Sequence, residues 1–325
     1  MTEQRKSLGY FIGHVNNAEH RYKASSGGLG TMLQKYLLST GQYGTSITFQ
    51  FNTDRCMYEV KLIHTAEEVN ICGSIYQDIN IAQFIHNHIA EITNGIIVSC
   101  PPCQVSVIRN MLNREGIPCF IISFCCSGQT TIEGTWKYYE LLGIKKEDVI
   151  NMQYRGNGWP SGIQIWLKNN TKIFRDNYTE PWKTIHASWL YRPKRCFFCT
   201  YGTSQTADIS LADPWLINFI ANDTIGNTLF IVNTDKGERI IHNLKEANLI
   251  DFSQSDYNSY YYAQQPNIEK NNRIRNQQKL IYTLLWLTQK QCIRNYFSKS
   301  WHRMKQFIKL SYYIQFKALT TRKKA

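Results

Sequence analysis

Cysteines at separate places in the sequence could together hold a metal centre. Cys196 and Cys199 form a Cys-x-x-Cys pair, a spacing typical of two thiolates that bind one metal group. Thiolate sulfur suits zinc and iron–sulfur clusters, and a cluster commonly takes four cysteines. Two more ligands must therefore come from elsewhere, and Cys103 and Cys126 are the natural candidates because each follows a predicted strand.

Other interpretations of the ten cysteines stay open. Cys100 and Cys103 could join the later pair in a zinc site, although 92 residues separate the pairs and zinc ribbons usually have ~15–20. A thioredoxin-like site at Cys100 and Cys103 is an alternative, although two prolines between the cysteines would be atypical. The isolated cysteines are expected to be core or surface thiols: Cys56, Cys72, Cys119 and Cys292.

The sequence shows no feature of an exported or membrane-spanning protein. Its N-terminus lacks the apolar core of a signal peptide, and no apolar run approaches the ~20 residues that a membrane helix needs. We therefore expect a cytoplasmic protein whose cysteines are metal ligands and buried thiols rather than disulfides. The 43% hydrophobic and 19% charged residues indicate an ordinary globular chain and exclude a disordered one.

Two successive strand–cysteine–helix segments should position the candidate ligands. Residues 95–99 and 117–124 are predicted to be buried strands, and residues 104–114 and 131–142 the helices that follow them. This order predicts βαβ units in a parallel sheet, where ligands bind outside the carboxyl ends of the strands. Both cysteine groups follow strands at such ends, so they could meet in space.

A second set of residues could bind an anion such as a phosphate. Four residues precede a predicted helix at 29–38: Ser25, Ser26, Gly27 and Gly28. Serines can cap a helix, glycines let a ligand approach the backbone, and a helix N-terminus favours anions. A plain capped helix is the favoured interpretation of this local pattern alone. Arg155, Gly156 and Gly158 offer a cation and a flexible backbone, which would also suit a phosphate.

The second half of the chain changes character. Residues 163–175 and 229–242 each resemble a β-hairpin, with turn residues between two extended stretches. We therefore expect an α/β fold with a mixed, partly parallel sheet flanked by helices, a second β-hairpin-rich part and a helical C-terminal tail. The expected divisions are residues 1–150, 151–250 and 251–325.

Positive charge is concentrated at the C-terminus. Of the 37 Lys and Arg, thirteen lie in residues 271–325, which hold none of the 24 Asp and Glu, so residues 1–270 carry no net charge. A nucleic-acid-binding protein would more often spread basic residues over a folded face, so no nucleic-acid partner is expected. The amphipathic tail could contact the inner membrane surface or an acidic partner. The favoured, plainer interpretation is one or two helices packed on the body.

Six short segments occur in an order that is informative. They are residues 24–28, 102–104, 124–128, 154–162, 196–199 and 207–215. Their sequences are ASSGG, PCQ, FCCSG, YRGNGWPSG, CFFC and ADISLADPW. Each is weak alone, but together they resemble the coenzyme F-420 hydrogenase/dehydrogenase beta-subunit family over roughly residues 20–245.

The resemblance implies an oxidoreductase with a flavin (FAD) and a [4Fe–4S] cluster, in which the cofactors rather than an acidic or basic side chain carry the chemistry. By position in the family's motifs, the cluster ligands would be Cys103, Cys126, Cys196 and Cys199. Cys125 could replace Cys126, because the doublet leaves the alignment ambiguous by one position. The Ser25–Gly28 run would lie near the flavin, and the loop with Arg155, Gly156 and Gly158 would border the same cleft.

The chain departs from the family pattern at two places that bear on its partners. Ser74-Ile75-Tyr76 replaces a Ser-Lys-Tyr element, which leaves the substrate open between a deazaflavin-type cofactor and another small molecule. No ferredoxin-like segment precedes residue 25, so electrons are expected to come from a separate ferredoxin or electron-transfer subunit. Bacterial relatives often accompany surface-polysaccharide genes, which suggests a sugar-related substrate. The alternative is a zinc-stabilised, non-catalytic binding or scaffold protein that docks through its basic tail.

Overall fold

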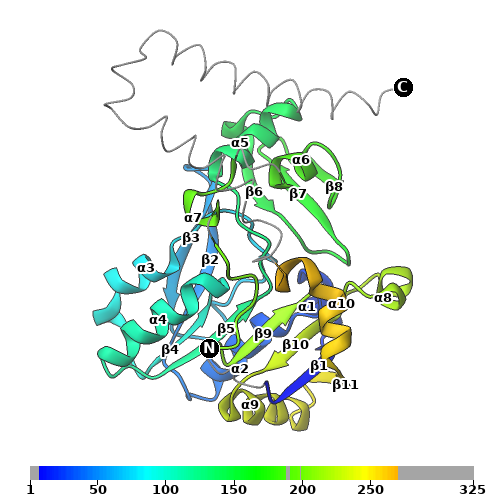
Figure 1. Cartoon of the computed structure of the whole chain (residues 1–325). Helices are drawn as coiled ribbons and strands as arrows, with labels where there is room; N and C mark the ends of the chain where they lie inside the picture. Colours follow the sequence, from blue (N-terminus) through cyan, green and yellow to red (C-terminus); the bar gives the residue numbers. More distant parts are fainter. Residues whose placement is uncertain (1–6, 188–190, 198, 270–325) are drawn as a thin grey trace, which may run out of the picture.

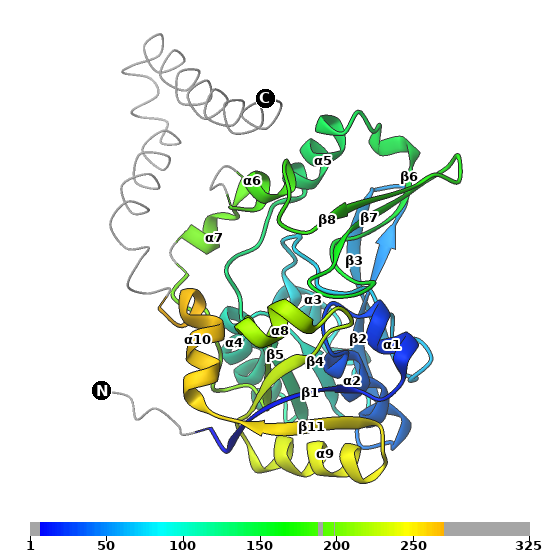
Figure 2. The same cartoon turned by 90° about the vertical axis from the view of Figure 1, so that its right-hand side faces the viewer.

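The computed structural model describes residues 7–187, 191–197 and 199–269, which form two sheets and the helices around them (Figures 1 and 2). The strands are β1 (Gly9–Val15), β2 (Thr45–Asn52), β3 (Met57–Ile63), β4 (Ile96–Ser99), β5 (Cys119–Phe124), β6 (Val149–Gln153), β7 (Gly162–Leu167), β8 (Lys172–Asp176), β9 (Ile209–Ala212), β10 (Thr228–Val232) and β11 (Ile250–Ser255). The helices are α1 (Ala18–Lys23), α2 (Leu29–Ser39), α3 (Ile81–Asn87), α4 (Pro102–Arg114), α5 (Ile132–Leu141), α6 (Trp182–Ala187), α7 (Lys194–Phe197), α8 (Ile217–Asn222), α9 (Asp235–Glu246) and α10 (Tyr257–Ile268).

The larger sheet has eight strands in the order β11-β1-β10-β9-β5-β4-β2-β3. Strands β2, β4, β5 and β9 run parallel to one another, and the remaining strands are antiparallel to their neighbours. The central strands are short apolar runs with almost every residue buried, as expected for strands covered on both faces. The predicted mixed, partly parallel sheet flanked by helices is therefore confirmed.

Helices cover both faces of this sheet through apolar residues at helical spacing. On one face, Leu29, Leu33 and Leu37 of α2 pack with residues of α9 against Ile97 and Phe120. On the other face, α3 and α4 pack against the alternate residues of the same strands, such as Ile96 and Ile121. Because successive strand residues point to opposite faces, one run of apolar residues serves both layers.

The smaller sheet has three antiparallel strands in the order β6-β7-β8 and lies above the larger sheet in Figure 1. Tyr138, Tyr139 and Trp182 of α5 and α6 pack on it with Met152. Tyr58 of β3 joins the two sheets, since its hydroxyl donates to the Met152 carbonyl at 2.5 Å. The predicted hairpin at 163–175 is confirmed as β7 and β8, with a turn at Asn170 in the left-handed region (φ 63°).

The second predicted hairpin, at 229–242, is wrong. Residues 228–232 form β10, but α9 follows directly instead of a returning strand. Thr234 caps α9 by accepting the amide of Gly237 at 3.1 Å, so the Asp-Lys-Gly sequence is a first helical turn. Ile240, Ile241 and Leu244 are buried at helical spacing and hold α9 on the sheet. These positions repeat every three to four residues, which the local turn pattern obscured.

Strands on both sides of residue 150 contribute to the larger sheet. Strands β9 to β11 return to it after the chain has built the smaller sheet from residues 149–176. The part expected at 151–250 therefore divides its strands between the two sheets. The basic segment 271–325, with its expected helices and Cys292, lies outside the described residues. No helix in the described part of the chain is both long and apolar enough to span a membrane.

Candidate functional site

The carboxyl edge of the parallel strands gathers most of the candidate residues. Strands β4, β5 and β9 end at this edge and lead to Cys103, Cys126 and Asp213, respectively. Strand β10 is antiparallel to β9, so Thr228 begins β10 at the same edge. The chain leaving β1 also arrives here, because the Val15 amide donates to the Gly27 carbonyl at 2.8 Å. This is the edge at which α/β sheets bind ligands.

The four predicted cluster ligands come together from three segments of the chain. Cys103 lies in the first turn of α4, where a hydrogen bond with the Cys199 thiol raises its pKa far above the usual range, and burial and Cys126 add to this effect. Cys126 is held beside the later pair because its amide donates to the Gly202 carbonyl at 2.8 Å. Cys196 is buried, and its charge acts with those of Cys126 and Cys199 on the guanidinium of Arg192. The three segments thus bring their cysteines to one edge of the sheet.

Four thiols are the kind of donor set that iron–sulfur clusters use. Within the described residues, no three or more His, Cys, Asp or Glu side chains are close enough to hold one metal ion. The Cys103 thiol resists ionising beside Cys199, and a bound metal would replace its proton.

The geometry also separates the two members of the cysteine doublet. The Cys125 amide continues the sheet by donating to the Leu211 carbonyl at 2.8 Å. Its sulfur lies 3.8 Å from the Tyr260 hydroxyl, in the cluster that α10 forms with β9 and β10. Burial raises the pKa of the Cys125 thiol to about 12. Because Cys126 is the member that neighbours Cys103, the arrangement supports Cys126 over Cys125 as a ligand.

The Ser25–Gly28 run is fixed by contacts with distant parts of the chain. Ser25 accepts a hydrogen bond from Ser74 at 2.9 Å, and the Ser26 hydroxyl lies 3.0 Å from that of Thr228. A Cβ at Gly27 would come within 2.4 Å of the Gly13 carbonyl oxygen and 2.7 Å of the Thr228 amide nitrogen. Position 27 therefore requires a glycine because its backbone lies against strands β1 and β10 of the protein itself. Gly28 is needed for its positive φ of 82° at the start of α2.

Arg155 makes contacts different from those expected of a phosphate-binding cation. Its guanidinium forms two bonds with Asp213, at 2.6 and 3.1 Å, and donates to the Ser25 carbonyl at 2.8 Å and to Ser161 at 3.2 Å. Burial lowers the pKa of Arg155, but Asp213 outweighs this effect and the net pKa is raised. Arg155 therefore positions the Ser25 backbone.

Two glycines let the Arg155 loop pass close to other backbone segments. A Cβ at Gly156 (φ 138°) would lie 2.6 Å from the Lys23 carbonyl oxygen, and one at Gly158 (φ 98°) would lie 2.9 Å from that of Thr224. The Gly158 amide donates to the Tyr22 carbonyl at 3.0 Å. These contacts lock the loop after β6 to the end of α1, next to the Ser25–Gly28 run.

Asp213 connects the cysteines with the Arg155 loop. Besides pairing with Arg155, its carboxylate contributes to the raised pKa of Cys125, so it lies near the cysteine doublet. Its carbonyl accepts a hydrogen bond from Gln264 of α10 at 2.6 Å. The sequence showed Asp213 only as part of a family motif, and no local pattern pointed to the contacts of Thr228 or Arg192.

A cavity of about 350 Å³ lies beside the Ser25–Gly28 run. It is lined by residues of α1, α2 and the following chain: Asn17, Glu19, His20, Lys23, Met32, Lys35 and Ile71. Lys23 forms an ion pair with Glu19 in this hollow, and Lys35 adds a second cation. His20 is buried and lies 2.5 Å from the Thr31 hydroxyl.

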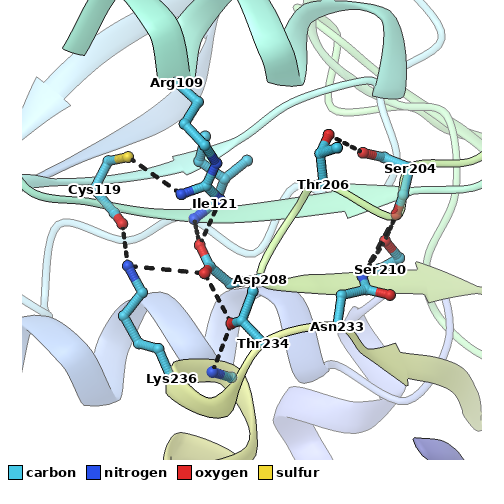
Figure 3. Close-up of polar contacts among 11 residues, drawn as sticks. Arg109, Cys119, Ile121, Ser204, Thr206, Asp208, Ser210, Asn233, Thr234 and Lys236 are labelled. Carbon is cyan, nitrogen blue, oxygen red and sulfur yellow. Dashed lines mark hydrogen bonds and ion pairs between the residues drawn. The ribbon is translucent and has the colours of Figure 1, made fainter. Parts of the chain in front are cut away.

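At the opposite edge, a buried carboxylate fixes the strands that carry the cysteines (Figure 3). Asp208, which immediately precedes β9, accepts the Ile121 amide at 2.7 Å and Arg109 of α4 at 2.9 Å. Its other oxygen accepts the Thr234 hydroxyl at 2.9 Å and lies 3.7 Å from the Lys236 ammonium. Asp208 thus ties α4, β5, β9 and the start of α9 together.

The segment after Cys199 is anchored close to the same place. The Ser210 hydroxyl donates to the Ser204 carbonyl, and the Asn233 side chain donates to the Ser210 hydroxyl at 3.1 Å (Figure 3). The Ser204 and Thr206 hydroxyls lie 3.2 Å apart. These contacts fix the chain that leads from Cys199 into β9.

The carboxyl edge of a mixed α/β sheet thus carries the predicted cysteines and, beside them, the Ser25–Gly28 run. The chain belongs to the coenzyme F420 hydrogenase/dehydrogenase beta-subunit family. The family model for the N-terminal part of this beta subunit matches residues 10–85, and the model for its C-terminal part matches residues 93–257. The sequence-based resemblance is therefore confirmed, and the family is one of oxidoreductase subunits.

Two individual proteins illustrate the relationship. The coenzyme F420 hydrogenase subunit beta of Methanococcus voltae is 26% identical over 213 residues, which cover 62% of this chain and 69% of the relative. A chain of the F420-reducing [NiFe] hydrogenase complex from Methanosarcina barkeri has a similar fold, with a TM-score of 0.64 at 16% identity. That likeness covers 87% of this chain and 95% of the other.

Proposed function

We propose that this protein is an iron–sulfur flavoprotein oxidoreductase. Cys103, Cys126, Cys196 and Cys199 would hold a [4Fe–4S] cluster, and FAD would lie beside the Ser25–Gly28 run and the Arg155 loop. The observation that carries the proposal is the gathering of Cys103, Cys126 and the Cys196–Cys199 pair, from three separate segments, at the carboxyl edge of the sheet.

The side chains of this site bind and orient rather than transfer protons. When bound, a flavin exchanges electrons in pairs or singly and a cluster exchanges them singly, so the two together convert between the modes. Arg155 holds the Ser25 carbonyl, and Thr228 holds Gly27 through a 2.8 Å bond from the Gly27 amide. This fixes the start of the 11-residue helix α2, whose N-terminus favours an anionic group such as a diphosphate. Lys35 adds positive charge in the adjacent cavity, where Lys23 is paired with Glu19.

The names of the similar proteins suggest what kind of protein could exchange electrons with this chain. The similar proteins are subunits named for a coenzyme F420 hydrogenase and for an F420-reducing complex. We propose that this chain likewise receives electrons from, or passes them to, a separate ferredoxin or electron-transfer subunit. Its substrate would be a deazaflavin-type cofactor or another small molecule. A role in polysaccharide biosynthesis, a cytoplasmic location and contact of the basic tail with the membrane surface stay predictions.

The test is an absorption spectrum of anaerobically purified full-length protein, with iron, sulfide, zinc and flavin assayed on the same sample. We expect about four irons and about one FAD per chain. Zinc without flavin would overturn the proposal and favour the zinc-stabilised scaffold. Flavin without iron or sulfide would also contradict it, because the four thiols would then have another purpose.

A further inference from the structure

Arg192 occupies a fixed position against the turn that carries Cys126. Its Nη1 donates to the Ser127 carbonyl at 2.6 Å, and its Nη2 donates to the His186 carbonyl at 3.3 Å. The preceding residue, Tyr191, is held in turn because its carbonyl accepts the Thr131 amide at 2.6 Å. Hydrogen bonds to the Ser127 and His186 carbonyls thus hold the guanidinium between the turn after Cys126 and the end of α6.

The backbone of this turn leaves space for the guanidinium. A Cβ at Gly128 would lie only 1.6 Å from Nη1 of Arg192, and Gly128 has a positive φ of 137°. Position 128 therefore requires a glycine for two reasons: its positive φ, and the lack of space for a side chain beside Arg192. A side chain at position 128 would displace Arg192.

The guanidinium contacts the residue next to Cys126, because the Ser127 carbonyl accepts its hydrogen bond. Burial lowers the pKa of Arg192, and the charges of Cys196, Cys126 and Cys199 act in the opposite direction. A second cation, Arg195, lies near Cys103, but it forms an ion pair with Asp78 and donates to Gln129 at 2.7 Å. Arg192 is the cation that faces the larger part of the cysteine group.

We propose that Arg192 raises the reduction potential of the cluster by holding a positive charge beside Cys126, Cys196 and Cys199. This inference rests on the proposed function, because it needs a cluster on these thiols. Reduction adds one electron to the cluster and makes its total charge more negative by one. A nearby cation in a partly dehydrated site stabilises the reduced state more than the oxidised state. Arg192 is a positioning and tuning residue that takes no part in proton transfer.

The test compares full-length Arg192→Gln and Arg192→Lys with the wild type after anaerobic purification. The cluster's midpoint potential is measured with dithionite and redox mediators, following the electron paramagnetic resonance signal of the reduced cluster, and iron is assayed on each sample. Arg114→Gln is the control, because it removes the same charge from an exposed position at the other end of α4. Neither readout depends on knowing the substrate.

We expect Arg192→Gln to lower the midpoint potential, so that at the wild-type midpoint the reduced-to-oxidised ratio falls roughly tenfold or more. Arg192→Lys should stay near the wild-type potential, and Arg114→Gln should be unchanged. If the Arg192→Gln protein loses its iron, normal iron content and a normal midpoint potential in Arg192→Lys would still show that the positive charge at position 192 matters. An unchanged potential in Arg192→Gln overturns the inference, as does equal loss of iron in both variants. A wild type without iron and sulfide instead overturns the proposed function itself.

Discussion

Arg155 and Asp213 form a two-pronged ion pair that joins the loop after β6 to the residue that follows β9. The two nitrogen–oxygen distances are 2.6 and 3.1 Å, and the side chains are 5% and 14% exposed. This pair connects the smaller sheet to the carboxyl edge of the larger one, beside the cysteines. Planar bidentate pairing of this kind fixes orientation as well as position, so the pair sets how the Arg155 loop meets the Ser25–Gly28 run.

Asp213→Asn should destabilise the protein and loosen the proposed flavin site. The change leaves the Arg155 guanidinium buried without its carboxylate, a loss that typically costs ~3–5 kcal/mol. Denaturant unfolding measures the change in the free energy of unfolding, and FAD released per chain reports the site. Asp54→Asn is the control, because Asp54 is exposed in the turn between β2 and β3. Equal stability of the two variants would show that the ion pair is not what joins the sheets.

Cys126→Ala and Cys125→Ala should differ sharply in iron content. Cys126 neighbours Cys103, whereas Cys125 lies against Tyr260 and packs beneath α10. We expect Cys126→Ala to lose most of its iron and Cys125→Ala to retain it, with at most a modest loss of stability from the removed sulfur. Iron and sulfide analysis of both proteins, purified side by side, makes the comparison. Loss of iron from Cys125→Ala alone would reverse the assignment of the ligand.

The parts of the fold that follow from local pattern were predictable from the sequence. The strands around Ile97 and Phe120 are uninterrupted apolar runs, and α2 and α4 show helical spacing that burial in the sheet reinforces. The cysteines followed these strands, so their convergence at one edge could be expected. The helix α9 was missed because Asp235-Lys236-Gly237 has the composition of a turn, and only burial of Ile240 and Ile241 on the sheet decides for a helix.

Local sequence pattern could not predict the contacts that residues of the site make with distant parts of the chain. The local sequence showed Arg155 as a cation that would suit a phosphate, but not its pairing with Asp213, 58 residues away in the chain. The local pattern left Gly27 open between a plain capped helix, which it favoured, and close approach of a ligand, and it did not show the contacts with Gly13 and Thr228. Residue types identify what a segment could do, but the partners that tertiary packing brings decide which of those roles a side chain keeps.

Gly27→Ala should lower both stability and flavin content, in contrast to Gly41→Ala. The added methyl group at position 27 would meet backbone atoms of Gly13 and Thr228, neither of which is the end of a flexible side chain. Gly41 has a positive φ of 67° but nothing within 4 Å of a Cβ, so its substitution introduces only backbone strain, ~1–2 kcal/mol. Thermal unfolding and FAD content should place Gly27→Ala clearly below Gly41→Ala. Normal FAD content in Gly27→Ala would separate this run from the flavin site.

His20 should make the protein less stable as the pH falls from about 6.5 to about 4. Burial, and to a lesser extent Lys35, lowers the pKa of His20 to about 4 in the folded state, whereas an unfolded histidine keeps a value near 6.5. Well above pH 6.5, His20 is unprotonated in both the folded and the unfolded state, so it does not lower the free energy of unfolding. Between the two values the unfolded state binds the extra proton, so the free energy of unfolding falls by ~1.4 kcal/mol per pH unit for this group. Burial also lowers the pKa of His186 to about 4, which adds a second contribution of the same sign.

Urea unfolding of His20→Gln at several pH values therefore isolates one of these contributions. We expect the slope of unfolding free energy against pH to be smaller in His20→Gln than in the wild type over this window. His242→Gln, which replaces an exposed histidine on α9, should keep the wild-type slope. The same slope in all three proteins would mean that burial does not keep His20 neutral in the folded state. A reduced slope would tie the α1–α2 junction, and with it the geometry of the Ser25–Gly28 run, to the neutral form of His20.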